Sequence, residues 1–335
     1  MPNAVFSRRA LLGAACAAPL AGSARHVLAQ GLPEVVFLTP FGQIPAYAPD
    51  YVGVGGGFFE KNGIRVRIVG GNGSAAAIQQ VVAGQALVAR TGGIDVVRAV
   101  SGVGAPVRAV GTIAHTTTFK VISAADAPVK GPADLEGKTV GIVSAGGGTE
   151  NYLDIMLARV GTKKESVKRQ VVGNSPGAFD LVKLKRLDAF IADTGVAIQL
   201  RARNEPIFVL DIDPFASIPG QVYVASDEGI AKNGPQILAY LRGIRAAMQA
   251  IAADASGEMM LKAMQPFNLA DLKNPPAVVT TVRAEEELWE ARGKDNIVRI
   301  IPEAWQRGWQ EMQAAGLANA GDPSRAFTTA FSDQL

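Results

Sequence analysis

The sequence is poor in the two residues that most often carry metal or nucleophilic chemistry. It holds one cysteine, Cys16, and two histidines, His26 and His115. If the first thirty residues are removed during export, the mature chain keeps no cysteine and one histidine. Disulfides, a cysteine nucleophile and a cysteine–histidine zinc site are then excluded. A Ser-His-Asp triad would have to use His115.

An excess of charge is also absent from most of the chain. The formal charge of +3 comes from Arg8, Arg9 and Arg25, which lie in a leading segment without Asp or Glu. Without these three of its 33 Lys and Arg residues, the chain has 30 basic against 30 acidic residues. This balance gives no indication of a nucleic-acid partner or an anionic membrane surface. With 335 residues, 48% hydrophobic and 19% charged, the composition is typical of a soluble globular protein with one or two domains.

An apolar run long enough to span a membrane is absent too. The chain opens instead with Ser7-Arg8-Arg9, an Ala-rich apolar run, and a small-residue cleavage site at Val27-Leu28-Ala29. This order predicts an export signal over residues 1–29, cleaved near Ala29. The paired arginines resemble the twin-arginine type, and a general secretory signal stays open. A lipid attachment at Cys16 is disfavoured, because no Leu stands three residues before it.

The stretch 138–160 reads as a strand, a glycine-rich turn and a helix. Its apolar run at 140–143 predicts a buried strand, and apolar residues recur at i, i+3, i+4 and i+7 from Leu153. The turn between them, 144–148, contains three glycines. The first N–H groups of a helix lack internal partners, so such a turn can bind an anion or a polar head group. A tight turn without a ligand is the alternative.

The same strand, turn and helix order recurs along the chain, which predicts parallel sheets flanked by helices. Ligands in such folds bind beyond the carboxyl ends of the strands, where the turns gather. The repeats lie at 66–83, 86–100, 139–160, 170–184 and 188–203.

Two passages, 118–132 and 214–220, break this alternation, and we interpret them as two crossings between lobes. Two connections suit a hinge that closes on a ligand. A single α/β domain with long loops is the alternative. The predicted division is 31–118 plus 224–335 for lobe one, 125–218 for lobe two, and 119–124 and 219–223 for the hinge crossings.

The last third of the chain is predicted to be helical. Pro235 begins a helix with an apolar face, and Pro302 begins another. In the second helix we assign Trp305 and Trp309 to core packing. The acidic run 285–287 is predicted to be a solvated face.

A family resemblance emerges between Tyr51 and Val66. The order Tyr-Val, four residues, Gly-Phe-Phe-Glu-Lys, one residue, Gly-Ile, one residue, Val resembles the opening of the solute-binding proteins of the sulfonate, nitrate and thiamine-pyrimidine group, which serve ABC importers. Asp-Leu-Glu-Gly-Lys-Thr-Val-Gly at 134–141 and Leu-Asp-Ala-Phe-Ile at 187–191 are similar to later family segments. The chain departs from the family in having Gly55-Gly56, Ala86 and Arg186.

The resemblance implies a two-lobed periplasmic binding protein fold of type II. It implies a periplasmic monomer that binds a small-molecule ligand, passes it to an inner-membrane ABC permease, makes or breaks no bond and needs no cofactor or metal. The implied ligands are sulfonates, oxyanions, pyrimidine precursors or aromatic carboxylates. Two alternatives stay open: an exported enzyme on the same fold, as in pyrimidine-synthase relatives that use pyridoxal phosphate and a histidine, and a ligand-sensing subunit of a membrane receptor.

On the cleft interpretation, each strand end contributes a turn to the ligand-binding site. Lobe one offers Phe41, Gln43, Gly71, Asn72, Ser74, Thr91, Gly92, Gly93 and His115. Lobe two offers Ser144, Gly146, Gly147, Gly148, Thr149, Asn174, Ser175, Asp193 and Thr194. Tyr223 lies where the chain returns across the hinge.

Each candidate also has a structural interpretation. Ser74 and Thr149 could only cap their helices, and His115 could be a satisfied structural residue. Phe41 could stack on a planar ligand or fill core. Asp193 could receive a ligand amine or cap the following helix.

Few cations fall in these turns. Arg90 and Lys120 are the nearest, and both are expected to point to solvent. An anionic ligand would then be held mainly by backbone N–H groups and hydroxyls, without a bidentate arginine.

Overall fold

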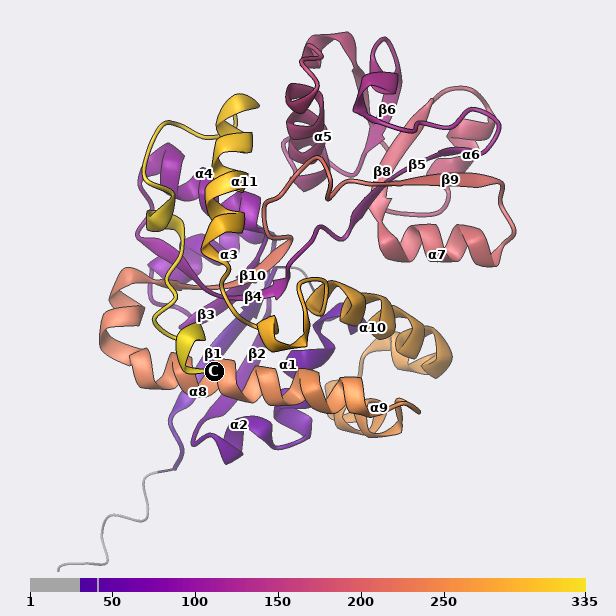
Figure 1. Ribbon diagram of the computed structural model, residues 1–335. Helices are drawn as coiled ribbons and strands as arrows, with labels where there is room; N and C mark the ends of the chain where they lie inside the picture. The colour runs from indigo at the N-terminus through magenta and orange to yellow at the C-terminus, as the bar shows by residue number, and fades with distance from the viewer. Residues whose placement is uncertain (1–30, 41) are drawn as a thin grey trace, which may run out of the picture. The chain divides into compact units, whose positions relative to one another are not determined.

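Two five-stranded sheets organise the part of the chain that the computed structural model describes, residues 31–40 and 42–335 (Figure 1). The expected export signal over 1–29 and Phe41 lie outside the described residues. The first sheet, in the order β2-β1-β3-β10-β4, consists of Arg65–Gly70, Glu34–Thr39, Val88–Thr91, Gln221–Ser226 and Val107–Ala114. The second, in the order β7-β6-β8-β5-β9, consists of Lys168–Val171, Thr139–Ile142, Ala189–Asp193, Phe119–Ala124 and Ile207–Asp211.

The two sheets share one pairing pattern. In the first sheet β1 is parallel to β2 and β3, while β10 is antiparallel to both β3 and β4. In the second sheet β6 is parallel to β7 and β8, while β5 is antiparallel to both β8 and β9. Each sheet is therefore mixed and mostly parallel. This confirms the predicted two-lobed α/β fold, with each sheet flanked by helices.

The antiparallel strand of each sheet is the one that the chain enters after leaving the other sheet. The connecting segments are 115–118, before β5, and 212–220, before β10. The expected crossing at 119–124 is strand β5, and the one at 219–223 overlaps the start of β10. Neither antiparallel strand begins one of the strand, turn and helix repeats predicted from the sequence. The sequence pattern therefore misses both strands.

Helices cover both faces of each sheet. On the first sheet, α3, α4 and α11 pack on one face. The helices α1, α2, α8, α9 and α10 pack on the other. On the second sheet, α5 packs on one face and α6 and α7 on the other. The bounds are α1 Ala48–Gly55, α2 Phe58–Lys61, α3 Ser74–Val82, α4 Gly93–Val103, α5 Gly148–Arg159, α6 Ala178–Lys183, α7 Thr194–Ala202, α8 Asp227–Ala253, α9 Glu258–Met264, α10 Pro275–Trp289 and α11 Pro302–Ala314.

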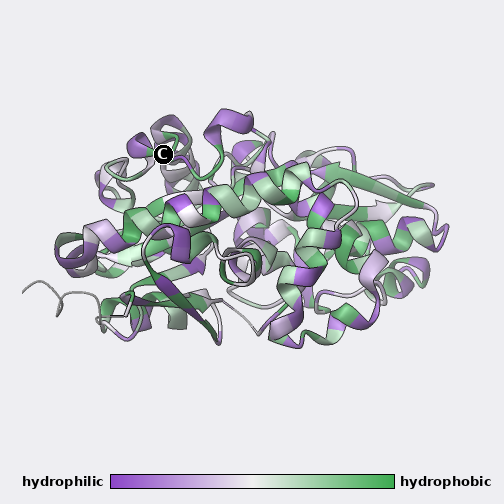
Figure 2. Ribbon diagram, turned by 90° about the horizontal axis from the view of Figure 1, so that it is seen from below, coloured by the Kyte–Doolittle hydropathy of each residue, from purple (hydrophilic) through white to green (hydrophobic). Residues whose placement is uncertain are grey.

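Hydropathy follows this layering. Figure 2 shows hydrophobic residues in the strands and along one side of the long helices. Helix α8 begins before Pro235, but Asn233 has non-helical backbone angles, because the proline removes a helical N–H and crowds the preceding turn. Trp305 and Trp309 are buried in the core, which confirms their predicted packing role. No described helix is long and apolar enough to cross a membrane.

A buried polar cluster joins α1, α8 and β10. The carboxylate of Asp50 is fully buried, and its Oδ1 accepts hydrogen bonds from the hydroxyls of Tyr223, at 3.1 Å, and Tyr240, at 2.6 Å. Phe37 packs against both tyrosine rings, with centroids 5.8 Å and 5.5 Å away. Strand alternation places Tyr223 on the sheet face that α8 covers.

Arg90 is buried beside this cluster, so the expectation that it points to solvent is wrong. Its guanidinium donates to the side chain of Gln221, at 3.1 Å, and to the carbonyl of Ala46, at 2.9 Å. It also lies 3.5 Å from the carboxylate of Glu285. Glu285 is only 15% exposed at its side chain, so the predicted solvated face of the run 285–287 is wrong at this position. A buried cation needs such partners, and α10 supplies one.

Asp50 gives the fold a defined pH dependence. Burial raises the pKa of Asp50 from 3.8 to about 6, against the opposing hydrogen bond from Tyr240 and the charge of Arg90. Because the folded pKa lies above the unfolded one, the ionised carboxylate opposes folding. This cost is absent below pH 3.8, grows as the pH rises to about 6 and persists above it. Relative to wild type, Asp50→Asn should gain about 3 kcal/mol in free energy of unfolding between pH 3.5 and pH 7 by urea denaturation. A difference that does not change with pH would contradict this assignment.

Gly55 allows α1 to approach α9 directly. A Cβ at this position would lie 1.9 Å from the carbonyl oxygen of Ala263. Gly55→Ala should therefore lower the free energy of unfolding by about 1–3 kcal/mol. Gly102, in α4, has open space around it, and Gly102→Ala should be neutral or stabilise by up to about 1 kcal/mol. Equal effects of the two substitutions in urea denaturation would refute the close approach.

Candidate ligand-binding site

The predicted lobe-one residues lie where β1, β2 and β3 end. Gln43 and Asn72 are exposed in the loops after β1 and β2. Gly71 lies against the backbone of β1, since a Cβ there would be 2.2 Å from the carbonyl oxygen of Thr39. Thr91 is fully buried at the end of β3, and its hydroxyl has no hydrogen-bond partner among the described residues. Ser74, Gly92 and Gly93 stand at the starts of α3 and α4.

Sequence reasoning missed Asp95, in the first turn of α4. Its Oδ2 lies 2.8 Å from the position that a Cβ of Gly92 would occupy. Ser74 and the backbone of Gly92 favour the ionised form of this carboxylate. Burial raises the pKa of Asp95, while the Ser74 bond and the charge of Arg98 act to lower it. An acid three residues into a helix after a glycine turn is a capping signal, and it could have been recognised.

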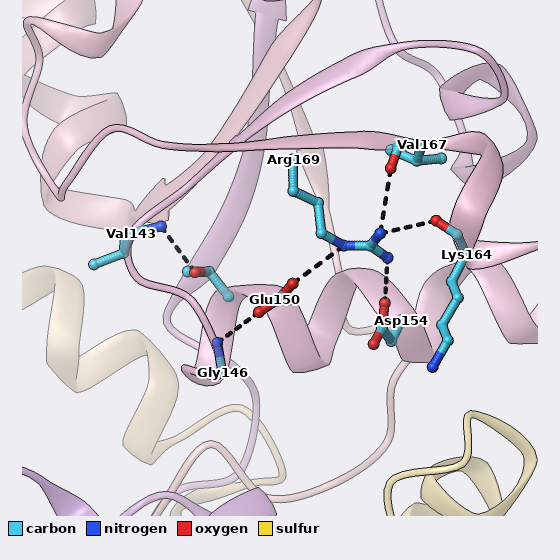
Figure 3. Close-up of polar contacts among 8 residues, drawn as sticks. Val143, Gly146, Glu150, Asp154, Lys164, Val167 and Arg169 are labelled. Carbon is cyan, nitrogen blue, oxygen red and sulfur yellow. Dashed lines mark hydrogen bonds and ion pairs between the residues drawn. The ribbon is translucent and has the colours of Figure 1, made fainter.

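The glycine-rich turn of lobe two is held by two side chains of α5 (Figure 3). The backbone N–H of Val143 donates to the hydroxyl of Thr149 at 3.0 Å. The N–H of Gly146 donates to Oε2 of Glu150 at 2.5 Å. The other oxygen of Glu150 lies 3.4 Å from Nε of Arg169. Thr149 therefore closes the turn and does not cap α5, and Glu150 places a negative charge there.

Arg169 fixes the position of Glu150 (Figure 3). Its guanidinium also bonds Asp154 and donates to the carbonyls of Lys164, at 2.8 Å, and Val167, at 3.2 Å. Burial raises the pKa of Asp154, and the charge of Arg169 opposes that shift. The turn is thus tied to β7 through one arginine that holds two carboxylates.

The remaining glycines of this turn pack closely. A Cβ on Gly147 would lie 2.2 Å from the hydroxyl oxygen of Ser144, and one on Gly148 would lie 3.3 Å from the ring of Phe119. Ser144 is exposed. No side chain caps α5 at Gly147.

Asn174, Asp193 and Thr194 come together as predicted, but they bind one another and the backbone. The amide of Asn174 donates to Asp193, and the N–H of Asp193 donates back to Oδ1 of Asn174 at 3.1 Å. The other oxygen of Asp193 accepts from the N–H of Val196 at 2.9 Å, which is the helix-capping alternative. Thr194 donates to the carbonyl of Thr118 at 2.9 Å. Ser175 is exposed beside them.

Two predicted residues are held by protein groups away from the turns. Nε2 of His115 lies 2.8 Å from the carbonyl oxygen of Asn296, and burial lowers the pKa of this histidine. A neutral His115 donates that hydrogen bond, so it fits its structural interpretation. Tyr223 lies in the core with its hydroxyl on Asp50, so its predicted ligand contact has no support in the structure.

Strand β5 and helix α5 add an aromatic pair, and the connecting segments add a second acid. The rings of Phe119 and Tyr152 pack edge to face with centroids 5.9 Å apart. The hydroxyl of Tyr152 hydrogen-bonds Thr117, whose N–H donates to Asp213 at 2.7 Å. Burial raises the pKa of Tyr152, and the charges of Asp213 and Asp95 add to that rise. Asp95 of α4 therefore acts electrostatically on Tyr152 of α5.

Lys120 contributes little free charge to this region. Its Nζ lies 2.8 Å from Asp211, and its side chain is 13% exposed, so the expectation that it points to solvent is wrong.

The described residues contain no group of His, Cys, Asp and Glu that could hold a metal ion. A cavity of about 910 Å³ lies at the start of β6 and β8, the opposite end of the second sheet from these turns. Its lining includes Lys138, Phe179 and Lys185.

Comparisons with known proteins place this two-lobed α/β fold in a family. The family described as NMT1/THI5 like matches residues 44–257. The chain belongs to this family, which confirms the resemblance found in the sequence. No curated protein sequence matches the chain.

Solved structures show the same fold at low sequence identity. The alkanesulfonate-binding protein SsuA from Xanthomonas axonopodis, bound to MOPS, is 14% identical with a TM-score of 0.64, over 89% of this chain and 97% of that chain. The periplasmic aliphatic sulphonate binding protein SsuA from Escherichia coli is 16% identical with a TM-score of 0.64, over 85% and 91%. The periplasmic nitrate-binding protein NrtA from Synechocystis PCC 6803 is 14% identical with a TM-score of 0.65, over 90% and 88%.

The hydrogen bond inside the lobe-two turn can be tested by isosteric substitution. Thr149→Val removes the acceptor of a buried N–H and should lower the free energy of unfolding by about 1–3 kcal/mol. Thr112 is a matched control, since it is equally buried and its hydroxyl has no hydrogen-bond partner among the described residues. Thr112→Val should leave stability unchanged or raise it. Urea midpoints that fall equally for both variants would show that the turn does not depend on this bond.

Proposed function

We propose that the chain is the substrate-binding protein of an ABC importer. It captures a small polar solute between its two lobes and delivers the solute to an inner-membrane permease. The proposed lobes are 31–118 with 224–335, and 125–218. The protein acts by binding and domain closure, and no bond is made or broken.

One observation supports this proposal above the others. Two sheets of the same pairing pattern are joined by the two segments 115–118 and 212–220. The turns at the strand ends of these sheets carry the glycines and polar residues predicted from the sequence. In open α/β sheets such strand ends are where ligands bind. Two connecting segments allow the sheets to move as bodies about a hinge.

The proposed location is the periplasm. Residues 1–29 are the proposed export signal, with the twin-arginine pattern around Arg8 and Arg9. A monomer that carries solute to a permease needs no cofactor. The three structural relatives are sulfonate- or nitrate-binding proteins by name, and this supports transport over catalysis.

A thermal-shift screen tests this function. The protein is unfolded and refolded to remove bound solute, then mixed with sulfonates, nitrate, aminopyrimidines, aromatic acids, amines and pyridoxal phosphate. A binder at 100 times its dissociation constant should stabilise the fold by about 2.7 kcal/mol. Scattering should show a smaller radius of gyration with the same solute. If no solute and no small-molecule cell extract changes either quantity, the binding function is refuted.

A further inference from the structure

Each of the two glycine-rich turns that could bind an anion already holds a carboxylate of the chain. In the first sheet, Asp95 lies over the Gly92 turn at the start of α4. In the second, Glu150 accepts the N–H of Gly146 at the start of α5. At both helix starts an incoming anion would meet a carboxylate, although the helix dipole alone places partial positive charge there.

Asp95 is influenced by the charge of Arg98, which acts to lower its pKa, but it is not paired with that arginine. No ion pair within 31–40 and 42–335 includes Asp95. Arg98, one turn further along α4, directs its guanidinium to the carbonyl of Gly146 at 3.1 Å. Ser74 and the backbone of Gly92, which also favour the ionised form of Asp95, are neutral groups. A carboxylate that is partly desolvated and unpaired gains most from a cation brought by a ligand.

An unpartnered hydroxyl lies beside the same turn. Thr91 precedes Gly92 and is fully buried, and its Oγ1 has no hydrogen-bond partner in the described part of the chain. Strand alternation puts Thr91 on the same sheet face as Ala89, which packs in the core that α3 and α4 cover. Asp95 belongs to α4, so both oxygens lie on that side of the sheet.

The second sheet adds acid and aromatic surface to this region. Tyr152 lies close enough to Asp95 and Asp213 for both charges to act on it. Asp213 accepts the N–H of Thr117 and is joined to a cation by no ion pair between described residues. Lys120, the nearby lysine, is already paired with Asp211 at 2.8 Å. The charge of Arg98 acts on Asp95, and those of Lys120 and Arg292 act on Asp213, but Arg98 bonds the carbonyl of Gly146 and Lys120 bonds Asp211.

We propose that the solute carries a cationic amine or amidine head, which Asp95 binds at the start of α4. The inference rests on the proposed binding function and names the ligand class of that same site. Asp95 acts in two ways: it attracts a cation, and it excludes an anion from the N–H of Gly92. Specificity of this kind comes from repulsion of the wrong ligand as well as attraction of the right one.

Two isosteric probe series test the sign of the ligand charge. The first is benzamidinium, benzamide and benzoate, and the second is butylammonium, butyramide and butyrate. Each probe is titrated calorimetrically into the refolded, solute-free protein. In both series the cation should bind most tightly and the anion most weakly. This order in the wild type is itself a test, whether or not a variant folds.

Asp95→Asn then tests the residue. It should weaken the cations by about tenfold and strengthen the anions, because the acceptor shape is kept and the charge is removed. Asp227→Asn is the matched control: Asp227 also lies in a first helical turn, in α8, at the opposite end of the first sheet from Thr91. That variant should leave every probe unchanged.

The outcomes separate the inference from the function. If wild type prefers the anions, or if Asp95→Asn weakens cations and anions alike, the ligand class is wrong while the binding function stands. If no probe binds but a solute of the thermal-shift panel does, a solute with a basic nitrogen supports the class and one without overturns it. If nothing binds at all, the proposed function falls and the inference falls with it.

Discussion

The structure depends on a close backbone contact where the chain passes twice between its two sheets. A Cβ on Gly220 would lie 2.1 Å from the carbonyl oxygen of Thr116, and one on Gly93 would lie 2.3 Å from that of Pro219. The N–H of Gly220 also donates to the carbonyl of Ala114 at 3.0 Å. The two connecting segments therefore run side by side, with the start of α4 against them. Only glycine permits this spacing, and it sets where Thr91, Asp95 and Thr117 can lie.

The electrostatics follow from that placement. Because α4 begins against the connecting segments, its first-turn carboxylate at Asp95 is desolvated, and its charge acts on Tyr152 of α5. Glu150 is likewise fixed by Arg169 at the start of α5. Helix starts that commonly attract anions are in this way occupied by the protein's own acids. A cationic ligand is attracted by these carboxylates, whereas an anion would have to displace them from the helix starts.

Local pattern predicted much of this fold, and long-range packing decided the rest. The sequence reveals the features that depend on short-range patterns. These are the strand, turn and helix repeats, the family segment at 51–66 and the tryptophan pair of α11. Strand β5 has no helix after it, and its pairing partners β8 and β9 come later in the chain, so the local pattern predicts a crossing there. The burial of Arg90 depends on Glu285, almost two hundred residues away, which no local signal records. Asp95 could have been found, since an acid after a glycine turn is a recognisable cap.

The solute that the protein retains when purified from its own cells without unfolding tests the central claim most directly. It can be released by denaturation and identified by mass spectrometry and fragmentation. The account predicts a small molecule with a basic nitrogen, protonated at neutral pH. A sulfonate, nitrate or carboxylate without a basic nitrogen would contradict the role assigned to Asp95.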